Sequence, residues 1–128
     1  MKSLIPYLVF PGSCKEAMEF YKSILNADSL TLRTFGDSPV DVPEEATERI
    51  FDSELRIGNL IIKASDDLPD YPVKSGTNFS LFVAISDVQE RKTVFEKLSE
   101  DGSVMFPLDD NFGMLRDKFG IQWMLVKD

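Results

Sequence analysis

The same order of predicted elements occurs twice along this chain of 128 residues. Each half begins with an apolar stretch typical of a strand, followed by a helix-start signal and an apolar pattern of helical spacing. Three further stretches of strand character complete each half. One helix can cover only one face of a small sheet, so neither half buries its apolar surface alone. The duplication predicts an α+β fold whose halves pack together or pair with another chain.

The first half is predicted to span about residues 1–65. Ser13 and Glu16 form a capping-box pattern, in which the serine hydroxyl accepts a hydrogen bond from the backbone at Glu16. A helix is expected after this cap, and Gly58 begins a turn between two strands. Strands are expected over residues 4–10, 30–35, 50–57 and 60–65.

The second half is predicted to span residues 79–128, after a turn-rich linker at 66–78. Asp87 is expected to cap a helix, and Gly102 is expected to end it. Strands are expected over residues 79–85, 104–108, 113–117 and 121–126. Both halves together are interpreted as one domain made of two repeats.

Composition excludes several classes of protein. The chain has 14 Lys and Arg against 22 Asp and Glu, a net charge of −8, and no basic cluster offsets the repulsion of a phosphate backbone. Nucleic-acid binding is therefore not expected. Apolar runs are only a few residues long, so no membrane span is expected. The single cysteine, Cys14, cannot form an internal disulfide, which fits a cytoplasmic location.

The chain contains no histidine. No imidazole can therefore bind a metal or act as a general base, and nucleophile pairs that use histidine are excluded. Any chemistry must come from carboxylates, lysine, tyrosine, arginine or the backbone.

Three motifs resemble a known family. They are the opening segment 6–10 with the helix residues Phe20 and Tyr21, the central hairpin 55–66, and the final hairpin 117–124. These segments resemble the PhnB-like branch of the vicinal oxygen chelate superfamily, which shares the glyoxalase and bleomycin-resistance fold. The branch is often described as 3-demethylubiquinone 3-methyltransferase-like. The resemblance implies two βαβββ modules that form curved mixed sheets with outer helices, and a homodimer.

The resemblance also implies a metal site that this chain alters or lacks. The superfamily holds a divalent metal with His, Gln or Glu on four strands, and Asp52 stands where the branch commonly has a histidine. A lone carboxylate fits Mg²⁺ or Mn²⁺ better than Zn²⁺. The methyltransferase description has no counterpart in the residues, because no glycine-rich turn follows an early strand.

Strand alternation selects six residues as candidates to line a ligand cavity. In segment 50–57, Ser53 and Leu55 share the face expected under a helix, whereas Asp52 and Glu54 share the opposite face. The same argument applied to the other strands gives the full set of Tyr7, Asp52, Glu54, Lys63, Gln122 and Met124. The alternatives are a solvated face with a Glu54–Arg56 ion pair, a core tyrosine and a surface lysine.

Two other features leave alternatives open. Segment 36–49 carries five acidic residues and two prolines, and it is interpreted either as a lid over the cavity or as a solvated insertion. Cys14 lies in the first turn of the predicted helix, where a helix dipole can lower a thiol pKa, yet no histidine or second cysteine accompanies it. We therefore expect Cys14 to have no catalytic role.

Three hypotheses of function follow. The first is a homodimer that binds a small molecule in its cavity, for example a cationic aromatic drug. The second is a metal-dependent lyase, isomerase or dioxygenase with a divergent site. The third is a structural or regulatory dimer whose cavity is filled by its own side chains.

Overall fold

The computed structural model describes residues 1–128, which form two compact units, residues 1–73 and 74–128. The division falls inside the segment 66–78 that the sequence predicts as a linker. The first unit contains, in order, β1 (Tyr7–Phe10), α1 (Cys14–Ile24), β2 (Ser29–Thr34), the 3₁₀ turns η1 (Phe35–Asp37) and η2 (Glu44–Ala46), β3 (Ile50–Ile57) and β4 (Leu60–Asp66). The second contains β5 (Leu81–Ala84), α2 (Val88–Ser99), β6 (Ser103–Phe106), β7 (Phe112–Arg116) and β8 (Gln122–Val126).

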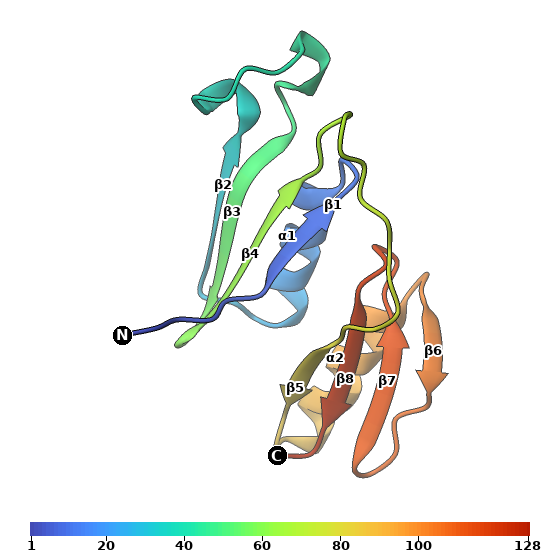
Figure 1. Ribbon diagram of the computed structural model, residues 1–128. Helices are drawn as coiled ribbons and strands as arrows, with labels where there is room; N and C mark the ends of the chain where they lie inside the picture. The colour runs from blue at the N-terminus through green and yellow to red at the C-terminus, as the bar shows by residue number, and fades with distance from the viewer. The chain divides into compact units, whose positions relative to one another are not determined.

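The two units have the same topology. The strand order is β1-β4-β3-β2 in the first sheet and β5-β8-β7-β6 in the second. In each, the first strand runs parallel to the last, and the remaining pairs are antiparallel. Figure 1 shows a single α-helix behind each sheet. The predicted α+β fold of two βαβββ modules is confirmed.

The core of the first unit lies between α1 and one face of its sheet. The helix buries Cys14, Ala17, Met18 and Tyr21, which follow helical spacing. The strand residues buried with them alternate along their strands, as a period of two requires. These are Leu8, Phe10, Ser53, Leu55 and Ala64.

The core of the second unit is built around Trp123. This side chain is almost fully buried, and its indole Nε1 donates to Asp117 Oδ2 at 2.9 Å. The other carboxylate oxygen of Asp117 accepts the backbone N–H groups of Phe119 (2.8 Å) and Ile121 (3.0 Å). One buried carboxylate therefore closes the β7–β8 turn and fixes the tryptophan, so its charge is compensated by three donors.

The predicted cap of α1 is wrong, and that of α2 is confirmed. Ser13 makes no side-chain capping bond. Instead, Asp66 at the end of β4 accepts Cys14 N (2.8 Å) through Oδ1 and Ile50 N (2.9 Å) through Oδ2. At the second helix, Asp87 Oδ2 accepts Glu90 N at 2.7 Å as expected. The Asp66 carboxylate, from a strand distant in the chain, thus replaces the local serine as the cap. It accepts the free backbone N–H at the start of α1 and the one at the start of β3 together.

The end of α2 also differs from the prediction. Asp101, rather than Gly102, takes the left-handed conformation, with φ of 59°. Gly102 is required for a different reason, because a Cβ there would collide with the carbonyl oxygen of Arg116. Neither helix of the chain has the length and apolar character needed to cross a bilayer.

The role of Asp66 gives a direct test. We expect Asp66→Ala to lower the free energy of unfolding by about 2–4 kcal/mol, because two buried N–H groups lose their acceptor. Ser13→Ala is the matched control and should change it by less than about 0.5 kcal/mol. Urea unfolding followed by circular dichroism measures both. A larger loss for Ser13→Ala than for Asp66→Ala would contradict this capping arrangement.

Candidate functional site

Each sheet has one face under its own helix and an opposite face that we call the open face. On the first sheet, the register places Tyr7 beside Lys63, Lys63 beside Glu54, and Glu54 beside Thr31. This row crosses all four strands of the sheet. Tyr7 is 51% exposed, whereas Leu8 and Phe10 are buried on the helix side, so the predicted alternation is confirmed.

The charged groups of this open face are paired with one another. Lys63 Nζ lies 3.1 Å from Asp52 Oδ1 and 4.0 Å from Glu54 Oε1. Arg56 Nε donates to Glu54 Oε2 at 2.8 Å, so the ion pair of the alternative interpretation, a solvated face, is present. These side chains are partly exposed, so each pair contributes at most about 1 kcal/mol to stability. The cluster gives the first sheet a wall that can exchange hydrogen bonds with a ligand.

The donor set of this face does not fit a resident metal ion. No group of three or more His, Cys, Asp or Glu side chains is placed to hold one. Asp52, the residue at the position where the resembling branch has histidine, has Lys63 beside it, and Glu54 has Arg56. Both carboxylates therefore have cationic neighbours that compete with a metal.

Gln122, predicted as a cavity residue on the second sheet, has its amide fully engaged. Its Nε2 donates to the carbonyl of Phe79 (2.8 Å) and to Ser80 Oγ (3.2 Å), and makes a longer contact with the carbonyl of Thr77 (3.3 Å). Its Oε1 accepts from Arg116 at 2.8 Å. With only 3% of its surface exposed, Gln122 holds the segment before β5 against the sheet.

Met124 belongs to a row that sequence reasoning missed. The register places Phe82 beside Met124, Met124 beside Met114, and Met114 beside Phe106. Phe82 is 65% exposed and Phe106 is 56% exposed. The open face of the second sheet is thus apolar where that of the first is charged. Alternation within each strand is the sequence signal that assigns a residue to a face. It does not show which strands are neighbours, so the row of four side chains becomes visible only from the strand pairing.

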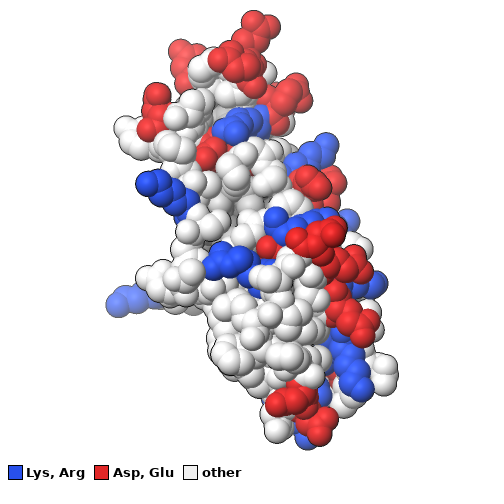
Figure 2. All heavy atoms as spheres, turned by 90° about the vertical axis from the view of Figure 1, so that its right-hand side faces the viewer, with Lys and Arg blue, Asp and Glu red and all other residues white.

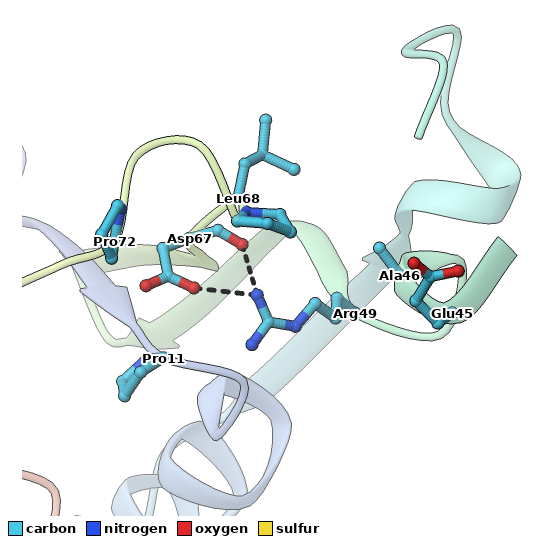
Figure 3. Close-up of a pocket in the computed structure, with 8 residues that line it drawn as sticks. Pro11, Glu45, Ala46, Arg49, Asp67, Leu68 and Pro72 are labelled. Atoms are coloured by element: carbon cyan, nitrogen blue, oxygen red, sulfur yellow. Dashed lines mark hydrogen bonds and ion pairs between the residues drawn. The ribbon is translucent and has the colours of Figure 1, made fainter. Parts of the chain in front are cut away.

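A separate pocket of about 400 Å³ lies where β1 and β4 end in the first unit (Figure 3). Its lining is mostly apolar and includes three prolines. Arg49 Nη1 donates to Asp67 Oδ1 and to the Asp67 carbonyl, both at 2.8 Å. Asp67 Oδ2 accepts Val73 N at 2.9 Å. The lining residues are Pro11, Glu45, Ala46, Arg49, Asp67, Leu68, Pro69 and Pro72.

The acidic segment 36–49 is anchored at its base. Phe35 N donates to the Arg49 carbonyl (2.8 Å) and Gly36 N to the Thr47 carbonyl (2.9 Å), and the side chains of Phe35 and Ala46 are buried. Figure 2 shows acidic side chains gathered at the end of the first unit that this segment forms. Its proposed role as a lid stays a prediction.

Cys14 is fully buried, with its Sγ 3.6 Å from Ser53 Oγ. Burial raises the pKa of its thiol to about 12, and the Asp66 and Asp52 charges act in the same direction, against the hydrogen bond with Ser53. The thiolate required for nucleophilic chemistry is therefore absent near neutral pH.

The raised pKa of Cys14 makes stability depend on pH. Below pH 9 the thiol is protonated in both states, so its contribution is fully present. Between pH 9 and 12 only the unfolded state loses the proton, so the free energy of unfolding falls, by up to about 4 kcal/mol at pH 12. Cys14→Ala should remove this part of the slope in urea titrations between pH 8 and 11. An unchanged slope would contradict the assignment.

Comparison with known proteins identifies the class. Residues 2–126 match the family model described as 3-demethylubiquinone-9 3-methyltransferase, so the chain belongs to this family. The protein YjdN of Escherichia coli strain K12 is 29% identical over 95% of this chain and 92% of its own.

Solved structures agree in fold. The crystal structure of protein PA1353 from Pseudomonas aeruginosa has a TM-score of 0.91 and 33% identity, covering 100% of this chain and 98% of its own. A fosfomycin resistance protein, FosX from Listeria monocytogenes, has a TM-score of 0.67 at 11% identity over 99% and 91% of the two chains, which shows a shared fold alone.

Proposed function

We propose that this protein acts in the cytoplasm as a homodimer that binds a small molecule at an open sheet face. The observation that carries the proposal is the pair of open faces with different chemistry. One presents Tyr7 and the ion-paired Lys63, and the other presents Phe82 and Phe106. Ligand sites are lined mainly by apolar side chains with a few polar groups that orient the ligand, and the two faces supply side chains of both kinds.

The family description names a methyltransferase, but that activity is not part of the proposal. The turn after β1 leads through Pro11 and Gly12 directly into α1, and only Gly12 in it is a glycine. A glycine-rich cofactor loop between a first strand and helix has no counterpart here. Binding requires only the side chains already placed on the open faces.

Two measurements on the purified full chain test the proposal. Sedimentation equilibrium should give a mass of twice the 14.5 kDa chain. Calorimetric titration with a panel of charged and neutral aromatic compounds should find at least one that binds. A monomer that binds none of them would overturn the proposal. A stoichiometric divalent ion in the purified protein, lost on Asp52→Ala, would instead support the metal-dependent alternative.

Lys63 should contribute to affinity for a ligand with polar groups. We expect Lys63→Met to weaken binding of such a ligand about tenfold, because truncating one charged partner at a site costs on this order. Lys15→Met on the exposed side of α1 is the matched control and should leave affinity unchanged. Equal losses in both variants would show that overall charge, rather than contact at the open face, governs binding.

A further inference from the structure

The open face of the second sheet is an apolar surface with soft, adaptable side chains. Its central row is Phe82, Met124, Met114 and Phe106, and Phe112 lies 6.0 Å from Phe106 between ring centroids. Methionine side chains adapt to irregular shapes and contact aromatic rings favourably. Phenylalanine faces stack with flat unsaturated groups. Such a row is better suited to contact a planar aromatic ligand than a flexible polar one.

One cation borders this row and has no anionic partner. Arg116 pairs with Gln122 in the register, two residues along the strands from Met114 and Met124, and so belongs to the same face. Its guanidinium donates only to neutral acceptors, namely the Gly120 carbonyl (2.9 Å), the Gly76 carbonyl (2.9 Å) and Gln122 Oε1 (2.8 Å). No carboxylate of the chain forms an ion pair with it.

The face contains no acidic side chain that could neutralise Arg116. The residues that share its orientation on β5, β7 and β8 are apolar or neutral apart from Arg116 itself. Figure 2 shows that charged side chains in the second unit gather mainly along one side, and the other side is mostly uncharged. α2, which packs against the opposite face, carries many of these charges. The open face therefore combines aromatic and thioether groups with one unneutralised positive charge.

We infer that the ligand is an aromatic anion, whose ring system lies on the Phe82–Met124–Met114–Phe106 row and whose carboxylate, sulfonate or phosphate group is attracted by Arg116. This inference rests on the proposed function and assigns the class of its ligand. It differs from the sequence hypothesis of a cationic aromatic drug, because a cation would be repelled by Arg116 and would meet no carboxylate on this face.

A second copy of the chain is a poorer occupant of the same face. Seating the first sheet of another copy directly on it would remove the ion-paired Lys63, Asp52 and Glu54 from water and place them against the apolar row. Seating two apolar faces on each other would bring two unneutralised Arg116 side chains into one interface. A small aromatic anion would contact the apolar row with its ring and neutralise Arg116 with its charge.

Two fluorescent probes with the same ring system separate the contribution of the aromatic rings to binding from that of the negative charge. 8-Anilinonaphthalene-1-sulfonate is an anion, and N-phenyl-1-naphthylamine is its neutral counterpart without the sulfonate. Each is titrated into the full-length native protein, with circular dichroism to confirm folding. Phe82→Ser and Phe106→Ser should weaken both probes about fivefold or more, because both lose a stacking surface. Leu60→Ser, an exposed apolar residue of the first unit, is the control and should change neither.

The charge contribution is tested at Arg116. Arg116→Gln should weaken the sulfonate probe about tenfold and leave the neutral probe within about twofold. Lys92→Gln on the exposed side of α2 is the charge-matched control. If Arg116→Gln is partly unfolded, Arg116→Lys and the salt dependence of the native protein replace it. Retention of sulfonate binding by Arg116→Lys, and weaker sulfonate binding at high salt, then support the inference.

The outcomes distinguish this inference from the proposed function. Binding of both probes that depends on Phe82 but not on Arg116 or salt would overturn the anionic ligand and leave small-molecule binding intact. Probe binding that is unchanged in Phe82→Ser and Phe106→Ser would overturn the location. Conversion of a dimer to a monomer by these variants, without probe binding by the native protein, would identify the face as a contact between copies. No binding by either probe or by any panel compound would overturn both.

Discussion

A four-stranded sheet with one helix can bury only one of its two faces, and this constraint governs both units. In each, the helix covers one face, and core residues such as Leu55 and Trp123 lie there. The opposite face is left without a helix of its own unit, so its side chains are free to differ without disturbing the core. Duplication of the module therefore produces two such faces in one chain. The strand order is the same in both units, but the side chains on the two open faces differ in chemistry.

The contrast between the two faces is clearest at equivalent points of the topology. Tyr7 and Lys63 stand side by side on β1 and β4, and Phe82 and Met124 stand side by side on β5 and β8. The first pair offers a hydroxyl and an ammonium group, and the second offers a ring and a thioether. The same backbone arrangement thus presents hydrogen-bonding groups in one unit and groups suited to dispersion contacts in the other.

The elements were predictable from the sequence because each depends on local signals. Apolar alternation located the strands to within a few residues, and Asp87 marked the start of α2 as expected. The cap of α1 was not predictable, because Asp66 is 52 residues away from Cys14 and nothing local to Ser13 reveals a better acceptor. The Glu54–Arg56 ion pair joins residues two positions apart, so strand alternation sufficed to predict it.

The apolar row on the second sheet could not be predicted, because its four members come from four strands whose pairing depends on the register. The burial of Gln122 depends on the carbonyls of Thr77 and Phe79 and the hydroxyl of Ser80, which the sequence did not place beside it. The pocket beside Arg49 likewise needs Pro11 and Pro72 brought together by the ends of β1 and β4.

The half-exposed state of the open-face side chains has an evolutionary consequence. Substitutions at exposed positions such as Phe82 or Tyr7 change folding stability little, typically within about 0.5 kcal/mol, whereas changes at Leu55 or Trp123 cost far more. Selection can therefore alter the chemistry of these faces through single mutations that stay above the stability threshold. A module of this kind is suited to diversify by gene duplication, with each copy free to explore new specificities on an unchanged framework.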